Sequence, residues 1–269
     1  METNKIYNED CIRGLTNIPD NSVDLIITSP PYEDISGAGY NGSKKDILFF
    51  KLYSDFVDKL FQEYYRILKK TGQIFFNVKS KTHIKTLRTP HWLEFLESFK
   101  MFKFKSYIIW KYAGSFDSTS KRFHLDYEII YHLSKSDDIY LNEKCGIKDP
   151  LTSVWYIPHN IKNRLHPTQM PEAVVERILN ICSRENDIVM DNFMGAGTTA
   201  VVCKKKNRRY IGFELSPEYF KIATERLDKT VSNFNPAKQE SLISVKRESA
   251  DSPNSPPIYN KKLEEENFA

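Results

Sequence analysis

The chain has 269 residues, of which 40% are hydrophobic, and a formal net charge of +4. This composition is typical of a globular protein with a slightly basic surface, which permits a nucleic-acid partner without requiring one. The first residues form no apolar signal peptide, and no run approaches the roughly 20 apolar residues of a membrane span. The cysteines are Cys11, Cys145, Cys182 and Cys203, and they show no metal-ligand spacing. We therefore expect reduced thiols, no metal site and a cytoplasmic protein.

The first half of the chain alternates apolar runs with amphipathic segments. Strand and helix alternation of this kind predicts an α/β fold with a mostly parallel sheet. The expected elements are a strand at VDLIIT (23–28), a helix at DFVDKLFQEYYRILKK (55–70) ending at Thr71-Gly72, a strand at QIFFNV (73–78), a helix-like HWLEFLESFK (91–100), and apolar runs at SYIIW (106–110) and YEIIYHL (127–133).

The second half repeats the alternation with better-marked ends. It predicts helix PEAVVERILNIC (171–182), strand DIVMD (187–191), helix TTAVVCKKK (198–206), strand YIGFE (210–214) and helix SPEYFKIATERL (216–227). Residues 112–165 between the two sets are less regular and rich in aromatic and basic side chains, as a specificity region or an ordinary surface excursion would be. We expect one domain over 1–230 and a disordered tail over 231–269.

A glycine-containing loop, DNFMGAGTT (191–199), joins a predicted strand to a predicted helix. Gly195 and Gly197 let the backbone approach a ligand closely, and the helix start near Thr198 offers unpaired N–H groups. Glu214 ends the following strand, where it can accept hydrogen bonds from ribose hydroxyls. The segment therefore predicts a nucleoside cofactor.

Two cofactor classes fit this loop. Gly195-x-Gly197-x-x-Ala200 matches the dinucleotide fingerprint, so an NAD-dependent oxidoreductase stays in consideration. Asp191 favours S-adenosyl-L-methionine, because a carboxylate at the strand tip would repel a pyrophosphate but attract the ammonium of a methionine moiety.

The first strand ends in Ser29-Pro30-Pro31-Tyr32. Two prolines fix two backbone φ angles and remove two N–H donors, so the carbonyls there are rigid acceptors. Ser29 adds an acceptor oxygen, and Tyr32 supplies a flat ring. Acceptors beside a stacking surface suit an exocyclic base amine, because accepting its N–H bonds favours the pyramidal, nucleophilic form. A proline turn that only ends a strand would explain the same four letters taken alone.

These segments resemble the amino-group DNA methyltransferases. TSPPY (28–32) resembles the catalytic motif of that family, DNFMGAGTT its S-adenosylmethionine loop, and HPTQMPEAVVERIL (166–179) the helix before that loop. The order, with the catalytic motif first, resembles the β arrangement, and the resemblance covers about residues 4–229. It implies a Rossmann-like class I methyltransferase fold, a mostly parallel doubly wound sheet with one reversed edge strand.

The resemblance also implies site residues. Ser29, Pro30, Pro31 and Tyr32 would be catalytic, and the cofactor would be bound by Asp10, Thr168, Asp191, Phe193, Gly195, Gly197, Thr198 and Glu214. Two positions depart from the family pattern: Asn192 stands where proline is usual, and Met170 where lysine is common.

The implied function is site-specific methylation of double-stranded DNA at the N4 amine of cytosine. Serine at the first motif position resembles the cytosine-N4 group, while aspartate is usual for adenine-N6, which remains the alternative. The base would be flipped out of the duplex and stacked on Tyr32. A restriction-modification system with a cognate restriction endonuclease is implied by resemblance, and both a monomer and a homodimer stay open. A non-catalytic DNA-binding module is a remote alternative.

Overall fold

The computed structural model describes residues 1–30, 44–78, 99–112, 126–142, 151–159, 162 and 164–231, with side chains of its long helix from residue 55 onward. These residues belong to one unit, Met1–Asn233. The predictions for Pro31 and Tyr32, most of the helix-like stretch 91–100, and nearly all of the proposed tail lie outside the described residues.

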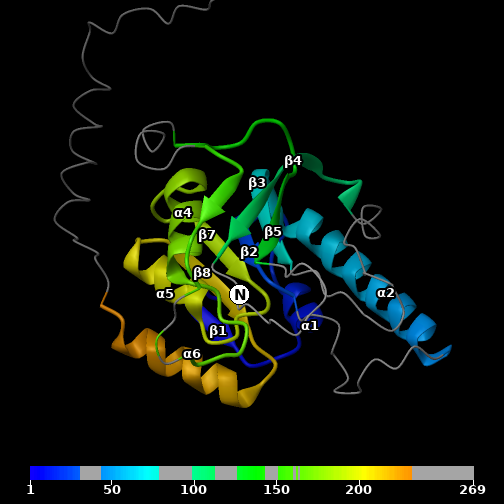
Figure 1. Ribbon diagram of the computed structural model, residues 1–269. Helices are drawn as coiled ribbons and strands as arrows, with labels where there is room; N and C mark the ends of the chain where they lie inside the picture. The colour runs from blue at the N-terminus through cyan, green and yellow to red at the C-terminus, as the bar shows by residue number, and fades with distance from the viewer. Residues whose placement is uncertain are drawn as a thin grey trace, which may run out of the picture. The chain divides into compact units, whose positions relative to one another are not determined.

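The described residues contain one eight-stranded sheet in the order β1-β8-β7-β2-β3-β5-β4-β6 (Figure 1). Its strands are β1 (Lys5–Tyr7), β2 (Val23–Thr28), β3 (Leu68–Val78), β4 (Lys103–Lys111), β5 (Tyr127–Ser134), β6 (Val154–Tyr156), β7 (Ile188–Asp191) and β8 (Arg209–Phe213). Every pair in this sheet is parallel except the two that β5 makes with β3 and β4. The mostly parallel sheet is confirmed, and its reversed strand is β5. That strand lies inside the edge, because β4 and β6 extend the sheet beyond it.

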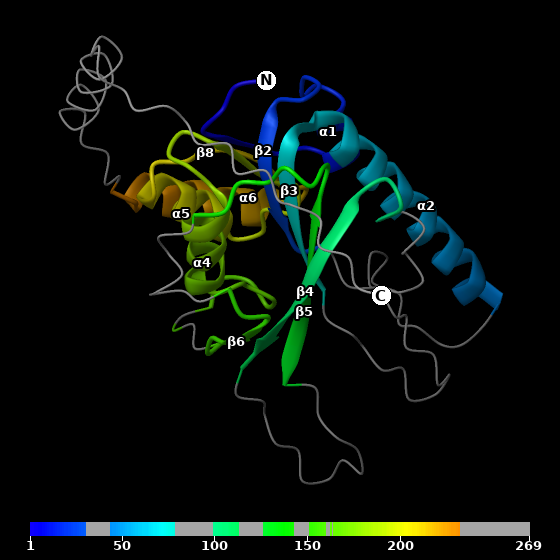
Figure 2. The same ribbon diagram turned by 90° about the horizontal axis from the view of Figure 1, so that it is seen from above.

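Helices cover both faces of the sheet, as Figure 2 shows. They are α1 (Cys11–Leu15), α2 (Lys44–Ile67), α4 (Glu172–Cys182), α5 (Thr198–Lys205) and α6 (Pro217–Lys229). Buried residues of α1 and α2 share one apolar cluster with Ile26, Ile74 and Met190, whereas those of α4, α5 and α6 share the other with Leu25, Phe75 and Val189. Alternate residues of one strand thus face opposite layers, which makes the predicted doubly wound arrangement.

None of the described helices is both long and apolar enough to cross a membrane.

The strand β3 begins earlier than the sequence predicts. We expected the preceding helix to end at Thr71-Gly72, but α2 ends at Ile67 and both residues belong to β3. Leu68 is fully buried and pairs with Val23 of β2. Pairing and burial therefore override a Thr-Gly pair that reads locally as a helix end.

Two short strands were not predicted, and two strands fall within the proposed specificity region. β1 and β6 have three residues each, too few to show an alternating pattern. β5 and β6 lie inside residues 112–165, so part of that region builds the sheet itself.

The candidate site residues lie mainly at the carboxyl ends of the parallel strands. We call this row of strand ends the sheet edge, as distinct from the outermost strands β1 and β6. Because β5 alone among the eight strands runs in the opposite direction, its start lies at the same edge as the carboxyl ends of the other seven strands. Open α/β sheets bind ligands at this edge.

Candidate active site

The glycine loop between β7 and α5 adopts left-handed backbone at both glycines. Gly195 has φ of 53° and Gly197 has φ of 80°. A Cβ at Gly197 would lie 2.8 Å from Cβ of Ala223, so this glycine lets α5 approach α6. A Cβ at Gly195 would come no closer than 3.7 Å to the ring of His166. Gly197 is therefore needed for packing, while Gly195 shapes a turn whose backbone lies against the ring of His166.

Glu214 holds the turn of the glycine loop in place. Its carboxylate accepts hydrogen bonds from the backbone N–H of Gly195 at 2.7 Å and of Ser216 at 2.8 Å. Asn8, which follows β1, donates its side-chain amide to the Glu214 carbonyl at 2.8 Å. Glu214 is half-buried, so its carboxylate is fixed at the mouth of the loop and still reaches solvent.

Asp191 connects the glycine loop to the strand that carries the catalytic motif. Its carboxylate is buried and accepts from Thr28 Oγ1 at 2.9 Å, Thr199 Oγ1 at 2.7 Å and the Phe193 N–H at 3.1 Å. Burial raises the pKa of Asp191 to about 6, and the three hydrogen bonds oppose that rise. The residue is thus a junction between β2, β7 and α5.

The remaining predicted loop residues are packed into the fold. Phe193 is half-buried, and its ring centroid lies 6.2 Å from that of Phe56. Thr198 is buried, and Arg226 of α6 donates to its Oγ1 at 3.4 Å. Asn192, which departs from the family pattern, is buried and accepts from Tyr64. This asparagine therefore ties the loop to α2.

The segment before α4 reaches the same loop. His166 lies beside Gly195, and its ring centroid is 4.3 Å from that of Tyr219. Burial lowers the pKa of His166, while the charge of Glu214 opposes this shift. Thr168 is exposed and donates its N–H to His166 Nδ1 at 3.2 Å. The structure thus brings His166, Gly195 and Glu214 together.

Asp10 caps a helix at the same sheet edge. Its side chain accepts from the Arg13 N–H at 3.1 Å, at the start of α1. It follows β1, whose neighbour β8 leads into Glu214. Asp10 is exposed, so it has a structural role and also remains accessible.

The predicted catalytic motif begins directly after β2. Ser29 is half-buried, and Asn77 Nδ2 donates to its Oγ at 3.4 Å. The same nitrogen donates to Glu128 Oε2 at 2.8 Å. Asn77 and Glu128 are both buried, on β3 and β5, and Pro30 is buried as well. Ser29 is therefore the half-buried end of a chain of polar side chains that spans three neighbouring strands.

The sequence model of a DNA methylase family, N6_N4_Mtase, matches residues 23–225. The chain belongs to this N6/N4 DNA methylase family. Among its relatives, Type II methyltransferase M.HpaI of Haemophilus parainfluenzae is 33% identical, over 84% of this chain and 74% of that protein. Type II methyltransferase M.BglII of Bacillus subtilis is 35% identical over 83% and 69%. DNA adenine methyltransferase YhdJ of Escherichia coli K12 is 30% identical over 91% and 88%.

Solved structures show the fold of this methylase. PvuII DNA methyltransferase (cytosine-N4-specific) superposes with a TM-score of 0.74 at 17% identity, covering 91% of this chain and 93% of that one. TTHA0409 of Thermus thermophilus, complexed with S-adenosyl-L-methionine, superposes with a TM-score of 0.67 at 23% identity. The match covers 86% of this chain and 95% of that one. The predicted class I methyltransferase fold is confirmed.

Sequence reasoning missed several polar residues of this methylase. Thr28 and Thr199 bind the Asp191 carboxylate, Asn8 supports Glu214, and Asn77 and Glu128 back Ser29. A polar residue inside an apolar strand is a usable signal for Asn77 and Glu128, since burial of such groups requires a partner.

Proposed function

We propose that this DNA methylase transfers a methyl group from S-adenosyl-L-methionine to the N4 amine of cytosine in double-stranded DNA. The observation that carries the proposal is the 2.9 Å hydrogen bond from Thr28 to Asp191. It joins the residue before Ser29 to the loop that contains Gly195. A methyl donor on that loop and an amine at Ser29 would thus lie at one edge of the sheet.

The residues of the glycine loop fit S-adenosylmethionine. The left-handed turn at Gly195 carries no side chain, and Glu214 is fixed there by two N–H donors while it still reaches solvent. Glu214 would accept from the ribose hydroxyls, and Asp10 would lie near the adenine. Both oxygens of Asp191 already accept hydrogen bonds, so its contact with the ammonium would use a remaining lone pair. When bound, the cofactor supplies an electrophilic methyl group on a positively charged sulfur.

Ser29 acts as a hydrogen-bond acceptor for the target amine. A hydroxyl oxygen has two acceptor lone pairs, so Oγ has the capacity to accept from Asn77 and from an N–H of the base. The Pro30 carbonyl supplies a second acceptor, and Tyr32 stacks on the flipped ring. No histidine is needed as a base for Ser29, because the nucleophile is the substrate amine.

The serine at the first motif position supports cytosine as the target. PvuII methyltransferase is by its title cytosine-N4-specific, but YhdJ is named an adenine methyltransferase. Adenine N6 is therefore the second candidate. A restriction-modification role is supported by the names of M.HpaI and M.BglII, which are Type II methyltransferases.

Labelled methyl transfer tests the proposal. The purified chain is incubated with labelled S-adenosylmethionine and unmethylated genomic DNA, and the nucleosides are then separated by mass spectrometry. N4-methylcytosine is expected, whereas N6-methyladenine would support the second candidate. Absence of both from all DNA tested would refute the proposed activity.

A further inference from the structure

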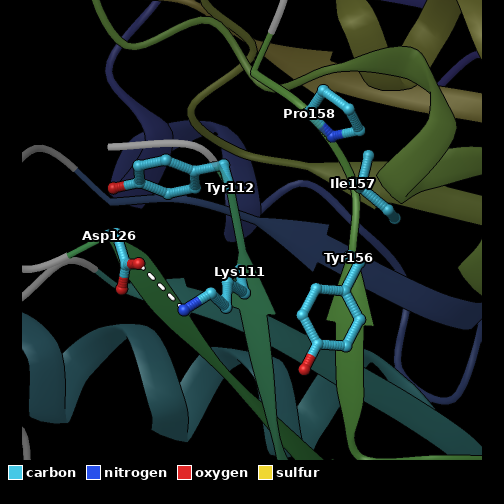
Figure 3. Close-up of a pocket in the computed structure, with 6 residues that line it drawn as sticks. All are labelled: Lys111, Tyr112, Asp126, Tyr156, Ile157 and Pro158. Carbon is cyan, nitrogen blue, oxygen red and sulfur yellow. Dashed lines mark ion pairs between the residues drawn. The ribbon is translucent and has the colours of Figure 1, made fainter. Parts of the chain in front are cut away.

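A hollow lies at the carboxyl ends of β4 and β6, with β3 and β5 between these strands and β2. It is lined by Lys111, Tyr112, Asp126, Tyr156, Ile157 and Pro158 and has a volume of about 200 Å³ (Figure 3). We name it the strand-end pocket. Because β4 and β6 run parallel to β2 and β3, their carboxyl ends reach the same sheet edge as Ser29.

Tyr112 connects the strand-end pocket to the catalytic motif. Tyr112 directly follows β4, in which Trp110 pairs with Glu128 of β5. Burial, and then the negative charges of Glu128 and Asp126, raises the pKa of Tyr112. Glu128 accepts from Asn77, and Asn77 donates to Ser29. Asp126 of the pocket lies two residues before Glu128, so the pocket adjoins the start of the strand that supports Ser29 through Asn77.

Hydrogen bonds join the chain segments that line the pocket. Trp110 Nε1 donates to the Ile157 carbonyl at 2.8 Å, and the Ile157 N–H donates to the Lys111 carbonyl at 3.1 Å. The N–H of Tyr112 donates to the Asp126 carbonyl at 2.9 Å. These bonds connect the ends of β4 and β6 and the start of β5.

The groups at the pocket mouth match the chemistry of a nucleobase. Tyr156 is 76% exposed, so its ring is available to stack on a base. Lys111 Nζ and an Asp126 carboxylate oxygen lie 2.9 Å apart and form an ion pair that reaches solvent. A cationic donor beside an anionic acceptor complements a base edge with an acceptor next to an amine, as adenine or a G·C pair presents in the major groove.

We propose that the strand-end pocket binds a base of the DNA next to the one that is methylated. Tyr156 packs on the flat face of that base, and Lys111 and Asp126 contact its acceptor and donor groups. The inference rests on the proposed function and deepens it, because it assigns residues to the choice of DNA sequence.

Two pocket variants and two matched controls test this assignment. Asp126→Asn and Tyr156→Ala alter the pocket. Asp137→Asn breaks a comparable exposed pair with Lys105, and Tyr107→Ala removes an exposed tyrosine of β4 outside the pocket. Sites methylated by the wild-type chain are first mapped by sequencing genomic DNA from a host without methylation, and duplexes with one such site then serve for kinetics.

The pocket variants should lower kcat/KM for DNA roughly tenfold or more and accept additional bases at one position of the recognition sequence. The controls should stay within about twofold of wild type, and cofactor affinity should be unchanged in all four. If Tyr156→Ala loses cofactor binding, Tyr156→Leu replaces it, since leucine keeps the bulk. Pocket variants that match the controls in rate and recognition sequence would overturn the pocket assignment alone. A wild-type chain that methylates no DNA would overturn the proposed function and this inference together.

Discussion

The two halves of the sheet edge are built in different ways. On the proposed cofactor side, Glu214, Gly195 and Asp191 lie within one short stretch of chain and are joined by backbone N–H donors. On the proposed base side, Ser29 follows one strand, Asn77 and Glu128 lie on two others, and the three residues meet through side chains. The residues of the proposed cofactor side can thus be recognised as a motif in the sequence. Those of the proposed base side come together only when the strands pair.

Replacing Ser29 should affect the base side alone. Ser29→Ala removes the acceptor for the target amine, so we expect kcat to fall roughly 10²-fold or more while the cofactor Kd stays unchanged. Single-turnover methylation and calorimetric titration measure the two quantities. Ser22→Ala, just before the same strand, is the control. Undiminished turnover by Ser29→Ala would remove this serine from the chemistry.

Asp191 joins the two sides, and its protonation should affect stability. Its pKa is raised from 3.8 in the unfolded chain to about 6 in the folded chain. Between these two pH values, the folded chain therefore keeps a proton that the unfolded chain has lost. Protonated Asp191 therefore makes its full contribution to the free energy of unfolding below pH 3.8, and this contribution is lost as pH rises through 6. The shift corresponds to about 3 kcal/mol. Urea unfolding from about pH 4 to about pH 8 should show this decline in wild type relative to Asp191→Asn. Parallel pH profiles would contradict the assigned shift.

Replacing Glu214 should affect the cofactor side alone. Glu214→Gln removes the charge that accepts from Gly195 and Ser216, each of which is a charge-assisted hydrogen bond. We expect the cofactor Kd to rise roughly tenfold or more, with kcat nearly unchanged once the cofactor is saturating. Glu218→Gln, in the first turn of α6, is the matched control. Equal affinities of the two variants would argue against Glu214 as a cofactor ligand.

Elements with local sequence signals at their ends were predicted from the sequence, whereas features that depend on strand pairing were not. The elements around Gly195 and Gly197 were found within a residue or two, because glycines, a Ser-Pro helix start and apolar periods mark their ends. The predicted start of β3 was wrong, since Thr71-Gly72 carries a local signal that pairing with β2 overrides. The partnership of Asn77 with Glu128 depends on the antiparallel register of β3 and β5, which no local pattern states.

The smallest expected effect tests whether the buried chain behind Ser29 positions its oxygen. Glu128→Gln keeps the shape but removes the charge that accepts from Asn77, so the asparagine should hold Ser29 less firmly. We expect kcat to fall about fivefold to tenfold, while the cofactor Kd and KM for DNA stay unchanged. A general loss of packing would instead lower the melting temperature without lowering kcat selectively. His132→Gln serves as the control, because His132 and Gln73 form a buried pair between the same two strands at the opposite end. That variant should lower the melting temperature and leave kcat unchanged. Equal kcat values for the two variants would show that Glu128 only stabilises the sheet.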